Sequence, residues 1–263
     1  MEQLTIVSFL APNWFGHYEA VAAYLGELFQ LETDLLQGED NPLTDTRLIN
    51  DELDLAFICG LPFSRYCYQA PAQLEALVAP VMQFPRYQDQ PVYFSDVIVP
   101  ANHTASSLAD LQEARFCYND RGSNSGYQMI CDRLFQAGYG SNFFKSATPS
   151  GSHQHSIRWV AEGLADCAAI DSTVLEREQA QNPDLIKHIR ILESIGPCPM
   201  PPLVVAQHLG QSVIHALRSA LLQPNQTLQD TLQQFNVKRF AAVQSKDYDS
   251  LRRKHDQLLS TWA

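Results

Sequence analysis

A short polar turn, Gly-Ser-Asn-Ser-Gly at residues 122–126, carries the strongest chemical signal in the sequence. It stands between an apolar run at 115–118, which predicts a strand, and an amphipathic stretch that predicts a helix. The first N–H groups of a helix have no partner inside the helix, and the helix dipole favours negative charge there. Neighbouring hydroxyl groups complete a site for an anion. We therefore expect Ser123, Asn124 and Ser125 to contact an oxyanion.

The same turn also has a structural interpretation, because serine often caps the start of a helix. Ser125 and Gln128 have the S-x-x-Q spacing of a capping box, in which the serine bonds the N–H group three residues on. Ser123 lies outside that box, which favours it as a pure ligand contact. The Asn124 amide can donate to an oxyanion, but it is neutral and reaches further than a hydroxyl.

Two further polar residues lie at the ends of predicted elements. His153 follows Gly-Ser and precedes a helical stretch. A histidine there donates to an oxyanion, more strongly when protonated, or is a solvated residue of the helix start. Asp171 ends the apolar run 167–170. It either caps the helix at 172–179 or faces the anion, where its charge disfavours fully ionised ligands.

The elements that must position these residues alternate between strands and helices. Apolar runs predict strands, and apolar residues spaced three or four apart predict helices. The predicted strands lie at residues 4–10, 53–59, 77–82, 96–99, 115–118, 167–170 and 203–206, and the main helices at 17–29, 211–222, 228–235 and 248–259. This alternation indicates an α/β fold with mainly parallel sheets flanked by helices.

Two proline-rich stretches, residues 80–91 and 197–202, each precede a predicted strand. They are candidate crossings between two lobes, although they also fit ordinary loops. On the two-lobe interpretation, residues 1–94 and 202–263 form lobe 1, residues 95–201 form lobe 2, and a ligand binds in the cleft between them.

Two aromatic residues complete the candidate site. Tyr93 lies on the proposed crossing strand, directly after the proline-rich stretch at 80–91, and its hydroxyl is expected to enter the cleft. Phe63 follows a Cys-Gly-Leu-Pro turn and is expected to form an apolar wall, although an aromatic side chain at such a place also suits a core.

Four blocks of sequence, weak singly, are specific in their order. They are LDLAFICG at 53–60, PVYFS at 91–95, SLADLQ at 107–112 followed by RFCYNDRGSNSGY at 115–127, and GSH at 151–153 followed by GLADCAAIDS at 163–172. Together they resemble the phosphonate-binding family of ABC-transporter solute receptors. The resemblance implies a two-lobed type II periplasmic-binding-protein fold, a bound phosphonate, phosphate or phosphite, and an ABC permease as partner. The family usually has threonine in place of Asn124, a departure that bears on the identity of the ligand.

Catalysis on the same fold is the alternative. The turn at 122–126 fails the G-x-S-x-G pattern because its central residue is Asn124. Ser123, His153 and Asp171 include the residue types of a catalytic triad, whose geometry the sequence does not give. The chain has no P-loop, GxGxxG or HExxH motif, and its six cysteines form no CxxC pair. We expect no enzyme activity, no cofactor and no metal.

Composition limits the partners. The formal net charge of −11 disfavours nucleic acid and anionic membranes, and no apolar run is long enough to cross a bilayer. We expect a monomer. No leader pattern precedes the first strand, which predicts a cytoplasmic location for the sequence as written, or a periplasmic or lipid-anchored one if a leader was removed. A cytoplasmic anion sensor that interacts with a protein partner is a further alternative.

Overall fold

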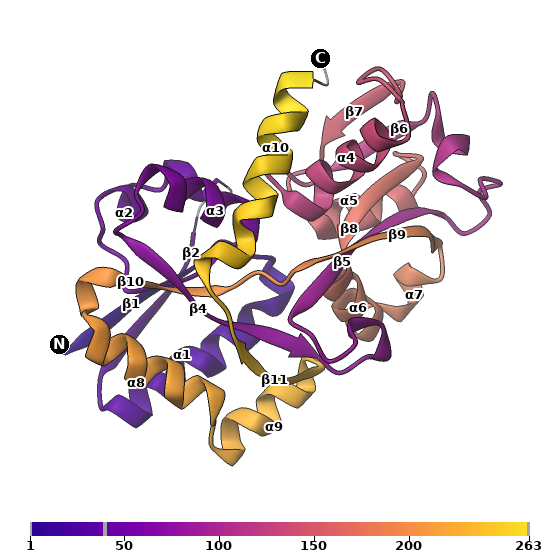
Figure 1. Ribbon diagram of the computed structural model, residues 1–263. Coiled ribbons are helices and arrows are strands. Elements are labelled where there is room, and N and C mark those ends of the chain that lie inside the picture. The colour runs from indigo at the N-terminus through magenta and orange to yellow at the C-terminus, as the bar shows by residue number, and fades with distance from the viewer. Residues whose placement is uncertain (1, 39–40, 262–263) are drawn as a thin grey trace. The chain divides into compact units, whose positions relative to one another are not determined.

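The computed structural model describes residues 2–38 and 41–261, and the chain divides into two compact units (Figure 1). Unit 1 comprises residues 1–92 and 199–250, and unit 2 comprises residues 93–198 and 251–263. Each unit consists of two segments: the chain leaves unit 1 after residue 92, returns to it at residue 199 and passes into unit 2 again at residue 251. Each unit is built around its own sheet.

The sheet of unit 1 has the strand order β11-β4-β10-β3-β1-β2. β1 pairs in parallel with both β2 and β3, whereas β10 and β11 pair antiparallel with their neighbours. The strands are β1 (Gln3–Ser8), β2 (Glu32–Gln37), β3 (Leu55–Phe57), β4 (Leu74–Met82), β10 (Leu203–Ala206) and β11 (Val237–Ala242).

Helices cover this sheet in unit 1. The α-helices are α1 (Phe15–Phe29), α2 (Thr46–Ile49), α3 (Gly60–Gln69), α8 (Gln211–Leu222) and α9 (Gln226–Gln234), and short 3-10 turns lie at Pro12–Trp14, Pro42–Thr44, Pro85–Tyr87, Gln207–Leu209 and Ser245–Tyr248. The core contains an unusual residue, because His17 on α1 is only 1% exposed among apolar and aromatic side chains.

The sheet of unit 2 has the strand order β7-β6-β8-β5-β9. β6 pairs in parallel with β7 and β8, and β5 pairs antiparallel with β8. The strands are β5 (Val92–Pro100), β6 (Arg115–Tyr118), β7 (Ser146–Pro149), β8 (Cys167–Asp171) and β9 (Ile189–Pro199).

The two faces of this sheet bury different helices. Its helices are α4 (Met129–Gln136), α5 (His153–Ala161), α6 (Ser172–Gln181) and α7 (Pro183–Ile186), with a 3-10 turn η4 (Leu108–Leu111) and a π-helical turn η5 (Asn124–Gln128). Ile130 and Leu134 of α4 pack on one face of the sheet, and Ile157 and Val160 of α5 pack on the other. Alternate side chains of the central strands therefore serve two separate cores.

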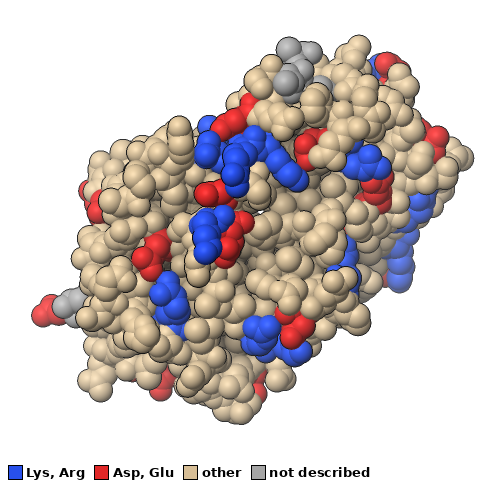
Figure 2. Space-filling model, viewed as in Figure 1, with Lys and Arg blue, Asp and Glu red and all other residues tan. Residues whose placement is uncertain are grey.

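The last helix, α10 (Asp249–Thr261), corrects the predicted lobe boundary. The prediction placed all of residues 202–263 in lobe 1, but residues 251–263 cluster with unit 2. The physical reason is burial, since Leu258 joins the apolar cluster that contains Ile130 and Leu134. Figure 2 shows basic and acidic side chains together over this helix, where Lys254 lies 3.7 Å from the carboxylate of Asp132.

The sheets are mixed, where the sequence predicted mainly parallel ones. β10 and β11 of unit 1 and β5 of unit 2 supply antiparallel pairs. All seven predicted strands coincide with observed strands, and β6 and β10 have the predicted bounds. The four strands without a prediction are β2, β7, β9 and β11. No helix in the described part of the chain is both long and apolar enough to span a membrane.

Candidate functional site

The polar turn at residues 122–126 adopts a π-helical conformation that continues directly into α4. The Gln128 N–H donates to the Ser123 carbonyl at 3.1 Å, and the Met129 N–H donates to the Asn124 carbonyl. Asn124 and Ser125 come too early in the turn to find a carbonyl acceptor within it. The turn therefore begins with N–H groups that donate no hydrogen bond within the helix.

The capping role that the spacing assigned to Ser125 belongs to Ser123. Ser123 is the N-cap, because its hydroxyl oxygen accepts from the Gly126 N–H at 3.0 Å. The expected capping box is absent, since the Gln128 amide donates to the Arg121 carbonyl at 2.9 Å and Ser125 bonds elsewhere. Ser123 is 9% exposed and keeps its own O–H for another acceptor.

Ser125 joins the turn to the start of α5. Its Oγ lies 3.2 Å from Nε2 of His153, and its carbonyl accepts from the Ser95 hydroxyl at 2.6 Å. His153 is 9% exposed, and burial lowers the pKa of its imidazole to about 4, so the ring is neutral at pH 7. Within the described residues, Nδ1 of His153 has no hydrogen-bond partner.

The side chain of Asn124 contacts the two ends of the segment 93–198 of unit 2. Its Nδ2 donates to the Tyr93 hydroxyl at 2.7 Å and to Sγ of Cys198 at 3.3 Å. All three residues are buried. An amide nitrogen carries two hydrogens, so this side chain has no donor left for an oxyanion.

Asp171 ends β8 and caps α6, as one of its two interpretations required. Its Oδ1 accepts from the backbone N–H of Thr173 at 2.8 Å and from the Thr173 hydroxyl at 2.7 Å. Burial nevertheless raises the pKa of this carboxyl to about 6. Asp171 on β8 is the register partner of Ser95 on β5. Because the Ser95 hydroxyl donates to the Ser125 carbonyl, Asp171 lies close to the turn.

Phe63 belongs to a different unit of the chain from the other six residues. It lies in the first turn of α3, in unit 1, and is fully buried. Its ring packs edge to face on Tyr248, with the centroids 5.5 Å apart. This environment fits the alternative interpretation, an aromatic side chain in a core.

Gly126 is required by the close packing of the turn. A Cβ at this position would lie 1.7 Å from Oδ1 of Asn119 and 3.1 Å from Cε1 of His153. The absence of a side chain lets the loop after β6 and the start of α5 meet the turn.

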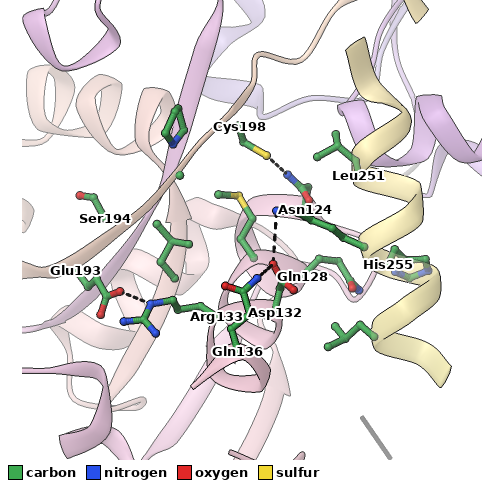
Figure 3. A pocket seen from close by; sticks show the side chains of 16 residues that line it. Asn124, Gln128, Asp132, Arg133, Gln136, Glu193, Ser194, Cys198, Leu251 and His255 are labelled. Carbon is green, nitrogen blue, oxygen red and sulfur yellow. Dashed lines mark hydrogen bonds and ion pairs between the residues drawn. The ribbon is translucent and has the colours of Figure 1, made fainter. Parts of the chain in front are cut away.

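A cavity of about 310 Å³ lies within unit 2, beside this turn (Figure 3). It is walled by α4, β9 and α10, and Asn124, Gln128 and Cys198 reach its lining. An ion pair between Arg133 and Glu193, 2.8 Å apart, borders it. Sequence reasoning missed this cavity because it depends on where α10 packs.

Among residues 2–38 and 41–261 there is no group of three or more His, Cys, Asp or Glu side chains that could hold a metal ion.

Two comparisons by sequence show which known proteins the chain is similar to. Residues 10–248 match the model of the family described as the phosphonate periplasmic substrate-binding protein of ABC transporters. A probable ABC transporter phosphite binding protein, PhnD1 of Prochlorococcus marinus strain MIT 9301, is 30% identical over 154 residues. That match covers 55% of this chain and 52% of the relative, about half the length of each.

Solved structures share the fold. PhnD1 of Prochlorococcus marinus in complex with methylphosphonate has a TM-score of 0.85 at 21% identity, over 98% of both chains. A binding protein component of an ABC phosphonate transporter from Pseudomonas aeruginosa has a TM-score of 0.81 at 17% identity, over 96% of this chain and 85% of that one. XAC2383 of Xanthomonas citri, bound to ATP, has a TM-score of 0.74 at 14% identity, over 97% and 99%. The fold is the two-lobed type II periplasmic-binding-protein fold, and it serves more than one ligand.

Proposed function

The chain belongs to the family of periplasmic substrate-binding proteins of phosphonate ABC transporters, and from this premise we propose that unit 2 binds a small phosphonate-class oxyanion at the turn 123–126. The protein then acts as the solute-binding component of an uptake system, with an ABC permease as its partner. It works as a monomer and catalyses no reaction.

One observation carries this proposal, the π-helical turn that begins with N–H groups no helical carbonyl can use. The donors are the backbone N–H groups of Asn124 and Ser125 and the hydroxyl of Ser123. Ser125 and His153 stand beside them as a bonded pair. A buried anion needs several hydrogen bonds at once, because each unreplaced bond to water costs binding free energy.

The Asp171 carboxyl sets the charge that this site accepts. With a pKa of about 6, it is mostly ionised at pH 7 and repels a second full negative charge. A ligand that keeps a proton or carries an amine avoids this repulsion. The proposal therefore favours hydrogen phosphonates and aminoalkylphosphonates over sulfate.

Isothermal titration calorimetry with phosphate, phosphite, methylphosphonate, 2-aminoethylphosphonate and sulfate tests the proposal. We expect at least one phosphorus oxyanion to bind with a Kd well below 1 mM, which corresponds to roughly −4 kcal/mol, and sulfate to bind more weakly. If no phosphorus oxyanion reaches that affinity, the proposed function is wrong.

The geometry does not favour the catalytic alternative. Ser125, not Ser123, contacts His153, and the described residues offer Nδ1 of His153 no carboxylate to orient the ring. Asp171 is engaged by Thr173 instead. A Ser–His–Asp mechanism needs the carboxylate on the far nitrogen of the histidine.

Replacement of Ser123 tests the proposed oxyanion site directly. We expect Ser123→Ala to weaken binding of the best oxyanion by roughly 1–3 kcal/mol, since a hydrogen bond to a charged ligand is lost. Removal of the N-cap also lowers stability by about 1 kcal/mol. Ser107→Ala is the matched control, because Ser107 is an exposed N-cap residue, that of η4, in the same unit. The control should lower the Tm without changing the Kd, whereas equal Kd values for Ser123→Ala and the wild type would remove Ser123 from the site.

A further inference from the structure

Asn124 connects three segments that are far apart in the chain. Asn124 itself belongs to the turn η5. Its side-chain amide donates to the Tyr93 hydroxyl on β5 and to Sγ of Cys198 on β9. The exposed fractions are 4% for Asn124, 1% for Tyr93 and 8% for Cys198. Bonds buried to this degree are shielded from competing water, which makes them costly to break.

The two acceptors mark the limits of the central segment of unit 2. Tyr93 is the first residue of that segment, and Cys198 is its last. A single side chain of the turn η5 therefore contacts both ends of the segment 93–198. Ser95 adds a second bond between β5 and the turn, since its hydroxyl donates to the Ser125 carbonyl at 2.6 Å.

The residue type explains why one side chain can do this. A threonine or serine hydroxyl has one hydrogen and a short reach, so it donates to one of these acceptors at most. The asparagine amide has two hydrogens on one nitrogen and donates to both acceptors. Its carbonyl oxygen is an acceptor only and has no attraction for an anion.

We propose that Asn124 is a positioning residue for the oxyanion site: its side chain fixes the N–H groups of the turn relative to Tyr93 and Cys198, and does not itself bind the ligand. This inference rests on the proposed function of the turn. It predicts that ligand affinity depends on the Asn124–Tyr93 bond as a unit.

A double-mutant cycle with methylphosphonate as the probe tests this dependence. Asn124→Ala and Tyr93→Phe should each weaken methylphosphonate binding by about tenfold or more. The double variant should be no weaker than the weaker single variant, because both changes break the same bond. Cys198→Ala should have a smaller effect, since sulfur is a weak acceptor.

Measurements of Tm separate positioning from general loss of stability. Ile130→Val serves as the matched control, because Ile130 is fully buried in the same unit and the change costs about 0.5–1.5 kcal/mol. This control should lower the Tm and leave the Kd unchanged. If Asn124→Ala does not fold, Asn124→Leu takes its place in the cycle, with the same expectation, because leucine is similar in size and has no hydrogen-bond donor.

The outcomes are distinct from a failure of the proposed function. Additive losses of affinity in the cycle, or an unchanged Kd for Asn124→Ala, would overturn the positioning role while leaving wild-type binding intact. A wild-type protein that binds none of the oxyanions would overturn the proposed function itself.

Discussion

Gly126→Ala should abolish tight oxyanion binding while leaving the two sheets folded. The added Cβ would lie 1.7 Å from Oδ1 of Asn119 and 2.9 Å from its Cγ, well inside van der Waals contact. The turn must shift to relieve this overlap. The shift moves the Ser123 hydroxyl, which accepts the Gly126 N–H, together with the N–H groups of Asn124 and Ser125. We expect the Kd for the best oxyanion to rise at least 100-fold, because two hydrogen bonds to a charged ligand account for roughly 3 kcal/mol or more.

A second substitution should restore part of this affinity. Asn119→Ala in the Gly126→Ala background removes both side-chain atoms that clash most severely and leaves His153 Cε1 at 3.1 Å as the remaining close neighbour. The double variant should therefore bind more tightly than Gly126→Ala alone. Asn119→Ala on its own should have little effect, because within the described residues its Oδ1 has no hydrogen-bond partner.

Gly140→Ala is the matched glycine control for this experiment. Gly140 lies in the same unit, is exposed, and would place its new Cβ no closer than 3.1 Å to a side-chain oxygen of Asn142. Calorimetry should give a wild-type Kd for this variant. A Kd for Gly126→Ala within threefold of the wild type, or no recovery in the double variant, would contradict the packing argument.

The strands that the sequence predicted are the strands whose two faces are covered. β6 and β8 lie inside the sheet of unit 2, and β10 and β3 lie inside the sheet of unit 1. Their continuous apolar runs follow from burial on both faces. The four strands without a prediction, β2, β7, β9 and β11, are the outer strands of the two sheets. Every residue of β7, Ser-Ala-Thr-Pro, is exposed, so no hydrophobic pattern marks it.

In the candidate site, too, the sequence indicates the residue types, whereas the hydrogen-bonding role of each residue depends on the folded conformation. The residue types needed for an anion turn were evident at Ser123 and Ser125. Which serine caps the turn depends on the hydrogen-bond period, and the π-helical period places the cap at Ser123. The orientation of Asn124 depends on Tyr93 and Cys198, which only the fold brings together. Ser95 ends the PVYFS block at 91–95, but nothing in its spacing singles it out as a contact of the turn.

His17 makes unit 1 sensitive to acid, and the His17→Phe variant should remove much of that sensitivity. The imidazole is 1% exposed and packs among the rings of Trp14, Phe57, Phe235 and Phe240, with centroid distances of 5.2 to 6.4 Å. Within the described part of the chain, neither ring nitrogen has a hydrogen-bond partner. Burial lowers the pKa of His17 to about 3, so the folded protein keeps the ring neutral.

The direction of the effect follows from proton binding in the two states. An unfolded histidine takes up a proton near pH 6.5, whereas folded His17 does so only near pH 3. Between these values the unfolded state binds the additional proton, and the free energy of unfolding falls by about 1.4 kcal/mol for each pH unit lost. His153 acts in the same direction down to about pH 4. Asp171, with its pKa raised to about 6, acts in the opposite direction between about pH 6 and its unfolded value, and offsets one of the two histidines.

Urea unfolding at pH 7 and pH 4.5, followed by tryptophan fluorescence, measures the contribution of His17. Relative to the wild type, His17→Phe should gain about 2–3 kcal/mol of unfolding free energy on going from pH 7 to pH 4.5. Phe57→Leu alters the same ring cluster without removing a titrating group, so its loss of stability should be similar at both pH values. Parallel losses in the wild type and in His17→Phe would show that the buried imidazole does not govern the acid response, because a phenyl ring in that cage takes up no proton in either state.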